Sequence, residues 1–223
     1  MQNNPFVVTR PRTAALELNT VIRNTYSLLS LTLLFSALMA FVSTSMEMSR
    51  IASLFCSIGA LLLMWFVLPR TANSGAGIGV VFAITGLLGL SIGPMLNHYL
   101  ALHNGAQLVM TSLGGTGVIF LGLSGYALTT RKNFSFMAGF LMVGMFVIVL
   151  ASIGNIFFHM PALQLAISAA VIMLMAGFIL YETSQLIHDP NANYIVATVS
   201  LYLSILNIFT SLLQILGVFS KDD

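Results

Sequence analysis

Long apolar runs, separated by short polar segments, dominate the chain from residue 25 onward. A helix needs about 20 apolar residues to cross the hydrocarbon layer of a membrane, and seven runs reach that length. They are Thr25–Ser45, Ile51–Pro69, Ile78–Leu102, Gln107–Thr130, Phe134–Phe157, Ala162–Ile187 and Tyr194–Phe219. No connection between them is long enough to separate two bundles. The pattern predicts an all-α fold, a polytopic membrane protein whose residues 25–219 form one seven-transmembrane-helix bundle.

The seventh run differs from the others in its polar content. Six hydroxyl and amide side chains interrupt it: Ser200, Ser204, Asn207, Thr210, Ser211 and Gln214. Polar side chains in a membrane helix are better placed against other helices than against lipid. We therefore expect the last helix to be central in the bundle.

The two ends of the chain are polar. Residues 1–24 contain two prolines and three arginines, and we expect them to form a disordered cytoplasmic tail ahead of an uncleaved signal anchor. Residues 220–223 form a short C-terminal tail. Lys and Arg are retained on the cytoplasmic side of membranes. With the N-terminus inside, Arg10, Arg12, Arg23, Arg70, Arg131 and Lys132 lie inside, whereas Arg50 and Lys221 lie outside. This predicts a cytoplasmic N-terminus and a periplasmic C-terminus.

Composition supports the membrane assignment and excludes several classes of protein. The 223 residues are 58% hydrophobic and only 6% charged, against about 25% charged residues in a soluble domain. The single cysteine, Cys56, excludes an intrachain disulfide and a cysteine-rich metal site. No basic cluster is present that would bind nucleic acid.

Glu182 is the one acidic residue that lies inside an apolar run. A carboxylate at the centre of a membrane helix costs about 2.5 to 3.5 kcal/mol, so such residues usually face the bundle interior or a wet cavity. We expect Glu182 near the cytoplasmic end of the sixth helix, facing the polar seventh. Arg70, at the inner end of the second run, lies in the right leaflet to pair with it. The alternative is a carboxylate that only reaches toward the headgroup region.

The third run contains closely spaced glycines followed by a proline. Gly89 and Gly93 fit the spacing that lets two membrane helices approach closely. Pro94 cannot donate a hydrogen bond to the carbonyl four residues earlier, so it predicts a kink. We interpret this segment as a kinked, closely packed helix rather than as a gating hinge.

Catalytic and cofactor sites find little support in the sequence. Ser124 lies in a Gly-Leu-Ser-Gly segment that resembles the nucleophile of rhomboid proteases, but such a serine needs a base within hydrogen-bond reach. His188, the histidine expected in the same leaflet, is more simply a solvated loop residue. The four histidines lack ligand-like spacing with carboxylates, and the last run has no lysine for a retinal Schiff base. We expect no enzyme activity, no cofactor and no metal site.

Segments distributed over the chain carry a family resemblance. They are 23–26 (Arg-Asn-Thr-Tyr), 85–89 with Gly93-Pro94, 128–132, 181–183 (Tyr-Glu-Thr), 193–195 (Asn-Tyr-Ile), 200–209 and 212–216. In order and spacing these segments resemble the Bax inhibitor-1 family, and the resemblance covers essentially the whole chain. It implies a seven-helix bundle with the last helix central. In some members it also implies a pH-dependent calcium leak controlled by two acids.

The resemblance bears directly on Glu182. The first family acid matches Glu182, and the second falls on Ser204, where this sequence departs from the family. A pair of acids titrates through like-charge repulsion, which a single acid lacks. We expect Ser204 to donate a hydrogen bond to Glu182, and Ser200 and Asn207 to share this polar face as a pH-sensing site or ion path.

Three functions follow as hypotheses. Among bacterial inner-membrane members, the resemblance implies a modulator and slowly degraded substrate of the membrane AAA protease FtsH, together with its HflK–HflC partners. A pulling protease would engage the N-terminal tail and stall on the apolar bundle. The alternative is a pH-sensitive leak for calcium or other cations. A third possibility is a structural membrane partner without transport of its own.

Overall fold

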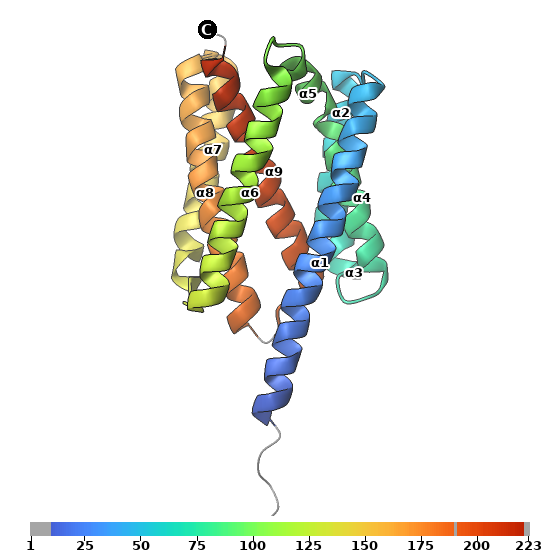
Figure 1. Ribbon diagram of the computed structural model, residues 1–223, viewed down its shortest axis with the longest axis vertical. Coiled ribbons are helices and arrows are strands. Elements are labelled where there is room, and N and C mark those ends of the chain that lie inside the picture. Colours follow the sequence, from blue (N-terminus) through green and yellow to red (C-terminus); the bar gives the residue numbers. More distant parts are fainter. Residues whose placement is uncertain (1–9, 190, 221–223) are drawn as a thin grey trace, which may run out of the picture.

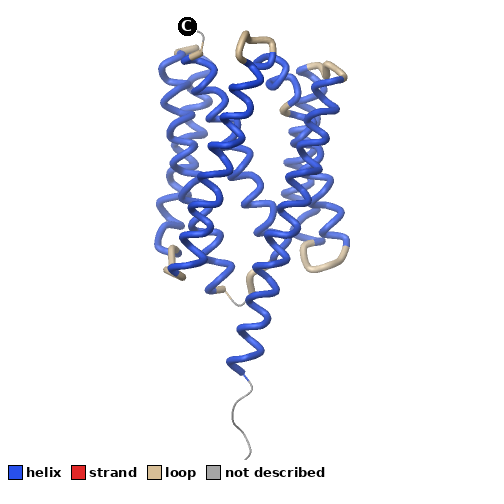
Figure 2. Tube along the Cα trace, viewed as in Figure 1, coloured by secondary structure: helices blue, strands red, loops and turns tan. Residues whose placement is uncertain are grey.

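A computed structural model describes residues 10–189 and 191–220, with side chains from residue 18 onward. This part of the chain is helical and contains no strands. Its α-helices are α1 (Arg10–Ser45), α2 (Arg50–Leu62), α3 (Leu68–Thr71), α4 (Ala76–Ser91), α5 (Gly93–Leu100), α6 (Gly105–Thr130), α7 (Ala138–Phe158), α8 (Pro161–His188) and α9 (Tyr194–Phe219). A π-helical turn, Leu63–Val67, joins α2 to α3, and a 3₁₀ turn, Ser135–Met137, precedes α7. Figures 1 and 2 show long antiparallel helices joined by short loops at both ends of the bundle.

The described chain contains seven helical segments long and apolar enough to cross a membrane, as the hydrophobic pattern predicts. α2 and α3 make the second segment, and α4 and α5 make the third. The observed segments end within a few residues of the predicted ones, and the first ends at Ser45 as predicted. The seven-helix prediction is confirmed.

The start of α1 differs from the expectation of a disordered tail. α1 is helical from Arg10, so the polar segment Arg10–Asn24 continues the first membrane helix. Figure 1 shows this part of α1 extending past the other helices. A helix already nucleated by a long apolar segment extends at little cost. The expectation of disorder is wrong for these residues, and residues 1–9 of the predicted tail lie outside the described chain.

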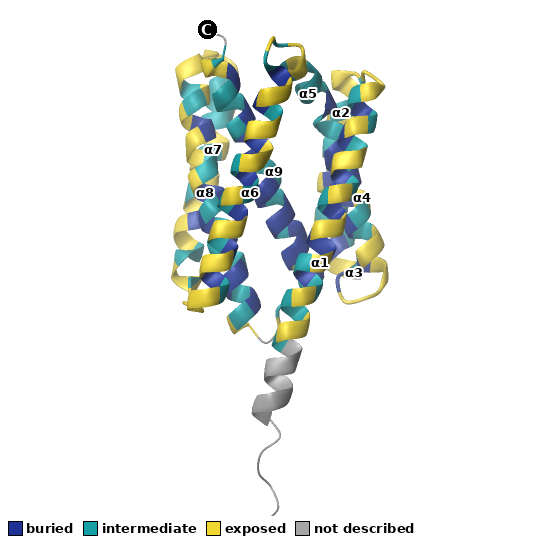
Figure 3. Ribbon diagram, viewed as in Figure 1, coloured by how far each residue is buried: buried dark blue, intermediate teal, exposed yellow. Residues whose placement is uncertain are grey.

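α9 lies at the centre of the bundle, as its polar residues predict. It packs against α1, α4, α6 and α8. In its most apolar 18-residue stretch 56% of the residues are buried, against 6% in the corresponding stretch of the segment that contains the peripheral helix α7. Figure 1 shows α9 crossing obliquely between the half that contains α1, α2 and α4 and the half that contains α6, α7 and α8. In Figure 3 its middle is largely buried, whereas the outer helices expose broad lipid-facing sides. α9 therefore joins the two halves.

The third membrane segment is broken between α4 and α5. The break falls at Ile92, and Pro94 lies in the first turn of α5. Because Pro94 has no N–H, the carbonyl of Leu90 loses its ordinary helical partner. Ser43 of α1 donates its hydroxyl to this carbonyl at 2.7 Å. The backbone group exposed by the break is thus satisfied by a neighbouring helix.

Glycines on α4 let it approach α1 closely. A Cβ atom built on Gly89 would overlap the backbone of Ser36, and one built on Gly86 would meet the ring of Phe35 at 2.7 Å. Across the break, a Cβ on Gly93 would overlap the side chain of Ser43. Only glycine allows this helix separation, which places α1 and α4 together against α9.

Candidate functional site

The α8–α9 hairpin brings Glu182 next to Ser200. Glu182 lies about one and a half turns, ~9 Å, before the end of α8, and Ser200 lies about as far after the start of α9. Because the two helices are antiparallel and joined by a short loop, residues equally far from the loop lie at the same depth in the bundle. Ser200 Oγ donates a hydrogen bond to Glu182 Oε1 at 2.7 Å. Glu182 is half-buried, so this hydroxyl replaces part of the lost hydration of the carboxyl group.

A cavity of about 250 Å³ connects Glu182 with the loop end of the hairpin. Polar groups of the loop, including Asp189 and Asn191, contribute to its wall. Asp189 is exposed and accepts a hydrogen bond from the backbone N–H of Asn191 at 2.9 Å. The carboxyl group of Glu182 is thus reached from the end of the bundle at which α1 begins.

Asn193 fixes the start of α9 in two ways. Its Oδ1 accepts hydrogen bonds from the backbone N–H groups of Ile195 and Val196, which caps the helix. Its Nδ2 donates to the carbonyl of Ala72 at 2.9 Å and to Oδ1 of Asn73 at 2.8 Å. The same side chain therefore caps α9 and ties it to the α3–α4 loop, which sets the depth at which Ser200 meets Glu182.

Ser204 does not bind Glu182, contrary to the expectation from the sequence. Its hydroxyl donates to the carbonyl of Ser200 in the same helix at 3.1 Å. Ser204 lies one helical turn beyond Ser200, and a serine side chain is too short to cover that turn. Asn207 likewise turns back to its own helix and donates to the carbonyl of Leu203 at 2.8 Å. Of the three polar residues expected around Glu182, the structure brings only Ser200 to the carboxyl group.

Arg70 is also apart from Glu182. It is exposed on α3, and no ion pair joins these two described residues. The two residues are separated by their lateral positions in the bundle rather than by their depth. α8 packs against α9, whereas Asn193, just ahead of α9, binds the carbonyl of Ala72 directly after α3. The first turns of α9 therefore lie between Arg70 and Glu182.

Pro94 lies in a different part of the molecule. It lines a separate cavity of about 540 Å³ toward the opposite end of the bundle, together with Arg50, Tyr99 and residues of α8 and α9. The structure thus groups Glu182 with Ser200 and leaves Ser204, Asn207, Arg70 and Pro94 outside the carboxyl group's immediate contacts.

Ser124 is buried and isolated. It is 3% exposed, and its Oγ has no hydrogen-bond partner in the structure. His188 instead contacts the carbonyl oxygen of Ser184 through Nδ1 at 2.9 Å. Within the described residues no group of three or more His, Cys, Asp or Glu side chains is arranged to hold a metal ion.

A second polar cluster, which no sequence pattern indicates, lies in the middle of the bundle. Tyr202 of α9 donates its hydroxyl to the carbonyl of Thr85 at 3.3 Å and accepts from Ser36, whose Oγ lies 2.5 Å from its oxygen. Tyr202 is among the largest fully buried side chains. Its partners are more than one hundred positions away in the chain, so no local pattern predicts the contact. The cluster joins α1, α4 and α9.

The fold and the site define a class of protein: a polytopic membrane protein whose central last helix contacts a single half-buried acid on the preceding helix. The family described as "Inhibitor of apoptosis-promoting Bax1" matches residues 18–221 of the chain. The protein belongs to this family, the Bax inhibitor-1 family.

Bacterial relatives match over nearly their whole length. The chain is 49% identical to a protein of Escherichia coli K12 named "Modulator of FtsH protease YccA", over 95% of both chains. A protein of Escherichia coli O6:H1 named "Inner membrane protein YccA" gives the same identity and coverage. A membrane protein of Vibrio cholerae is 43% identical over 99% of this chain and 100% of its own.

Proposed function

We propose that this protein is a non-enzymatic inner-membrane modulator of the membrane AAA protease FtsH and is itself a slowly degraded substrate of it. The observation that carries the proposal is the 49% identity, over 95% of both chains, to the E. coli protein named as a modulator of that protease. Partners are FtsH and, through it, the HflK–HflC complex. The protein acts in membrane-protein quality control.

Slow degradation has a physical basis in the bundle. A protease that extracts a membrane protein must remove helices whose backbone groups are satisfied only inside the helices themselves. Here seven membrane-spanning segments form the bundle, with α1, α4, α6 and α8 packed against α9, and contacts such as Ser43 with the carbonyl of Leu90 join one helix to another. Each step of extraction must break packing of this kind, so a protease engaged at one end stalls and is occupied.

The orientation we propose places the N-terminus in the cytoplasm. Arg23, Arg70, Arg131 and Lys132 lie near the end of the bundle at which α1 begins, and Arg50 lies near the other end. Basic residues favour the cytoplasmic side. In this orientation α1 projects from the bundle toward the side on which a cytoplasmic ATPase acts, and the C-terminus is periplasmic.

Affinity purification tests the proposed partners. The full chain, tagged at its C-terminus and extracted in mild detergent, should retain FtsH, HflK and HflC at ratios to the bait well above those of a tagged, unrelated seven-helix membrane protein. Mass spectrometry measures those ratios. Equal recovery of the three proteins with both baits contradicts the proposal.

A cation leak is the second candidate, and one observation favours it. Glu182 lines a cavity that reaches the loop end of the α8–α9 hairpin, so a cation has access to a carboxyl group inside a membrane-spanning helix. Ser204 weakens the proposal, because a hydroxyl bonded to its own helix replaces the second acid of the family pattern. One acid attracts a cation less strongly than two.

The leak predicts calcium flux that depends on Glu182. Protein reconstituted in liposomes should pass calcium faster than empty vesicles between pH 6 and pH 8, and Glu182→Gln should reduce that flux several-fold, because it removes the charge but keeps the shape of the side chain. Glu47→Gln is the control, since Glu47 lies in the exposed α1–α2 loop. Flux equal to that of empty vesicles across the pH range excludes the leak.

A further inference from the structure

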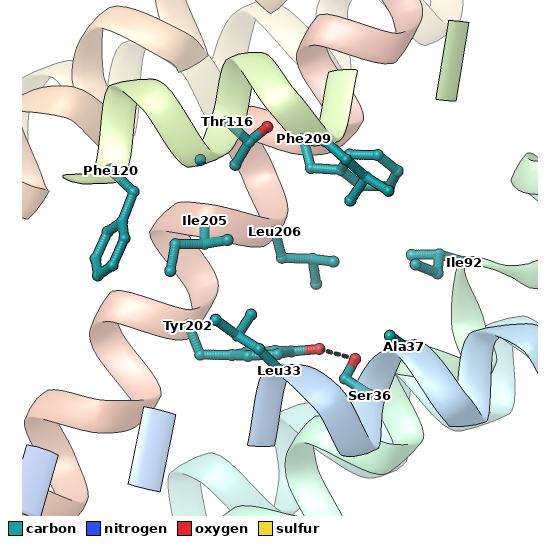
Figure 4. A pocket seen from close by; sticks show the side chains of 12 residues that line it. Leu33, Ser36, Ala37, Ile92, Thr116, Phe120, Tyr202, Ile205, Leu206 and Phe209 are labelled. Atoms are coloured by element: carbon teal, nitrogen blue, oxygen red, sulfur yellow. Dashed lines mark hydrogen bonds between the residues drawn. The ribbon is translucent and has the colours of Figure 1, made fainter. Parts of the chain in front are cut away.

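A cavity of about 280 Å³ lies between α1, α6 and α9, near the middle of the bundle. Figure 4 shows Phe120 and Thr116 of α6 on one side and Tyr202 with Ser36 on the other, with apolar side chains of α9 between them. It is distinct from the cavity at Glu182, with which it shares no lining residue. Nothing in the proposed protease function uses it.

The polar atoms in the cavity wall are already engaged. The Tyr202 and Ser36 hydroxyls bond to each other, and Tyr202 also donates to the carbonyl of Thr85. Thr116 donates to the carbonyl of Ser112 in its own helix at 2.7 Å. A water molecule in a cavity needs two to four polar partners, and apolar cavities of this kind stay dry and take up apolar molecules. The lining therefore favours an apolar occupant.

The cavity is continuous with the lipid-facing surface of the bundle. Two of its lining residues, Ala37 of α1 and Leu113 of α6, are exposed, and Leu113 is 55% exposed. Both lie in helices that are long and apolar enough to span the membrane. The medium beside the opening is therefore the hydrocarbon of the bilayer itself.

We propose that this cavity holds part of one acyl chain of a membrane phospholipid, which enters between α1 and α6. At about 280 Å³, the cavity is large enough for a segment of several methylene groups. An empty cavity forfeits van der Waals contacts along its wall. An acyl chain restores those contacts without any cost of leaving water, because it comes from an apolar medium.

Glycines on α6 offer a matched pair of variants. Gly117 lines the cavity, and a Cβ atom there meets nothing within 4 Å, so Gly117→Leu places a side chain in the cavity space without a backbone clash. Gly122 is exposed on the same helix, also has open space around its Cβ position, and does not line the cavity. Gly122→Leu therefore controls for adding a leucine to α6.

Native mass spectrometry of the full chain, reconstituted from vesicles of dioleoylphosphatidylcholine and returned to mild detergent, measures the retained phospholipid. The wild type and Gly122→Leu should each retain one phospholipid per chain. Gly117→Leu should retain at least about fivefold less, the low end of the penalty for overpacking a filled site. Equal retention by both leucine variants overturns the proposal, as does retention of added oleic acid in place of the phospholipid.

A second measurement needs no variant. Dioleoylphosphatidylcholine with a photoreactive diazirine in the middle of one acyl chain should label Leu206 and Phe209 inside the cavity of the wild type on illumination. Val118 and Leu121, on the exposed side of α6, report ordinary lipid contact. Labelling confined to these exposed residues means that no chain enters the cavity and overturns the proposal.

Discussion

Glu182 interacts with one hydroxyl group, and the identity of that hydroxyl decides what the residue can do. Ser200 donates to the carboxyl group, whereas Ser204, which matches the second acid of the family pattern, is bonded to its own helix. Glu182 is therefore bonded to a neutral donor at the position where the family pattern has a second acid nearby, and this contact lacks the like-charge repulsion of a directly paired acid.

Replacing Ser200 by alanine should destabilise the protein by about 1–2 kcal/mol, because it leaves a half-buried carboxyl group without its donor. Ser204→Ala removes a bond within one helix and should cost less than about 0.5 kcal/mol, since alanine is the better helix former. Denaturant titration in mixed micelles measures the free energy of unfolding of each variant. Equal losses for the two variants would mean that the contact with Glu182 carries no special weight.

The sequence indicates how deep a residue lies in the bundle but not which residues of other helices lie beside it. Hydropathy and loop charges place Glu182 and Arg70 at the same end of the bundle, and the structure agrees. Whether two residues at one depth touch depends on which helices are adjacent, and no local pattern encodes that. Ser200 was within reach of prediction, because it and Glu182 lie equally far from the loop of one hairpin.

Helix packing between α1 and α4 relies on glycines that admit no side chain. Gly89 contacts the backbone of Ser36, which cannot move aside as a flexible side chain would. About one helical turn further on, the helix breaks at Ile92, and the carbonyl of Leu90 accepts a hydrogen bond from the hydroxyl of Ser43. The close glycine contact and the hydrogen bond that compensates for the break therefore both lie in the interface between α1 and α4.

Gly89→Ala should destabilise the protein by about 1–3 kcal/mol through overpacking. Gly79→Ala, in the same helix but exposed and with open space at its Cβ position, should be neutral or stabilising by up to ~1 kcal/mol, because alanine favours the helix. The midpoint of thermal unfolding in detergent ranks the variants. A Gly89→Ala protein as stable as Gly79→Ala would show that α1 and α4 are not held this closely.

The elements themselves were largely predictable, since a membrane of fixed thickness demands apolar runs of fixed length. Seven runs and the central position of α9 follow from hydropathy and from the polar residues of the last run. The start of α1 was not predictable in this way. Hydropathy reports where a helix enters lipid, whereas the backbone of α1 continues as helix into the polar segment that begins at Arg10.

The whole molecule combines an apolar bundle, packed around α9, with a first helix that extends beyond the bundle. These two properties suit a protein that a membrane protease engages readily and dislocates slowly. The mid-bundle cavity adds a lipid-facing feature that is separate from the Glu182 site. In this account the protease engages the N-terminal segment that leads into α1, and the packed bundle resists extraction.

The most direct test of this account measures the half-life of another membrane-protein substrate of FtsH in cells that overproduce the chain. We predict that the full chain prolongs that half-life and that deletion of residues 2–11 abolishes the effect, while an equally long Gly-Ser replacement retains it, because the protease needs a tail to grip rather than a particular sequence. Immunoblots should show equal amounts of the three proteins in the membrane. A half-life that the full chain leaves unchanged, or that the deletion prolongs equally, would contradict the account.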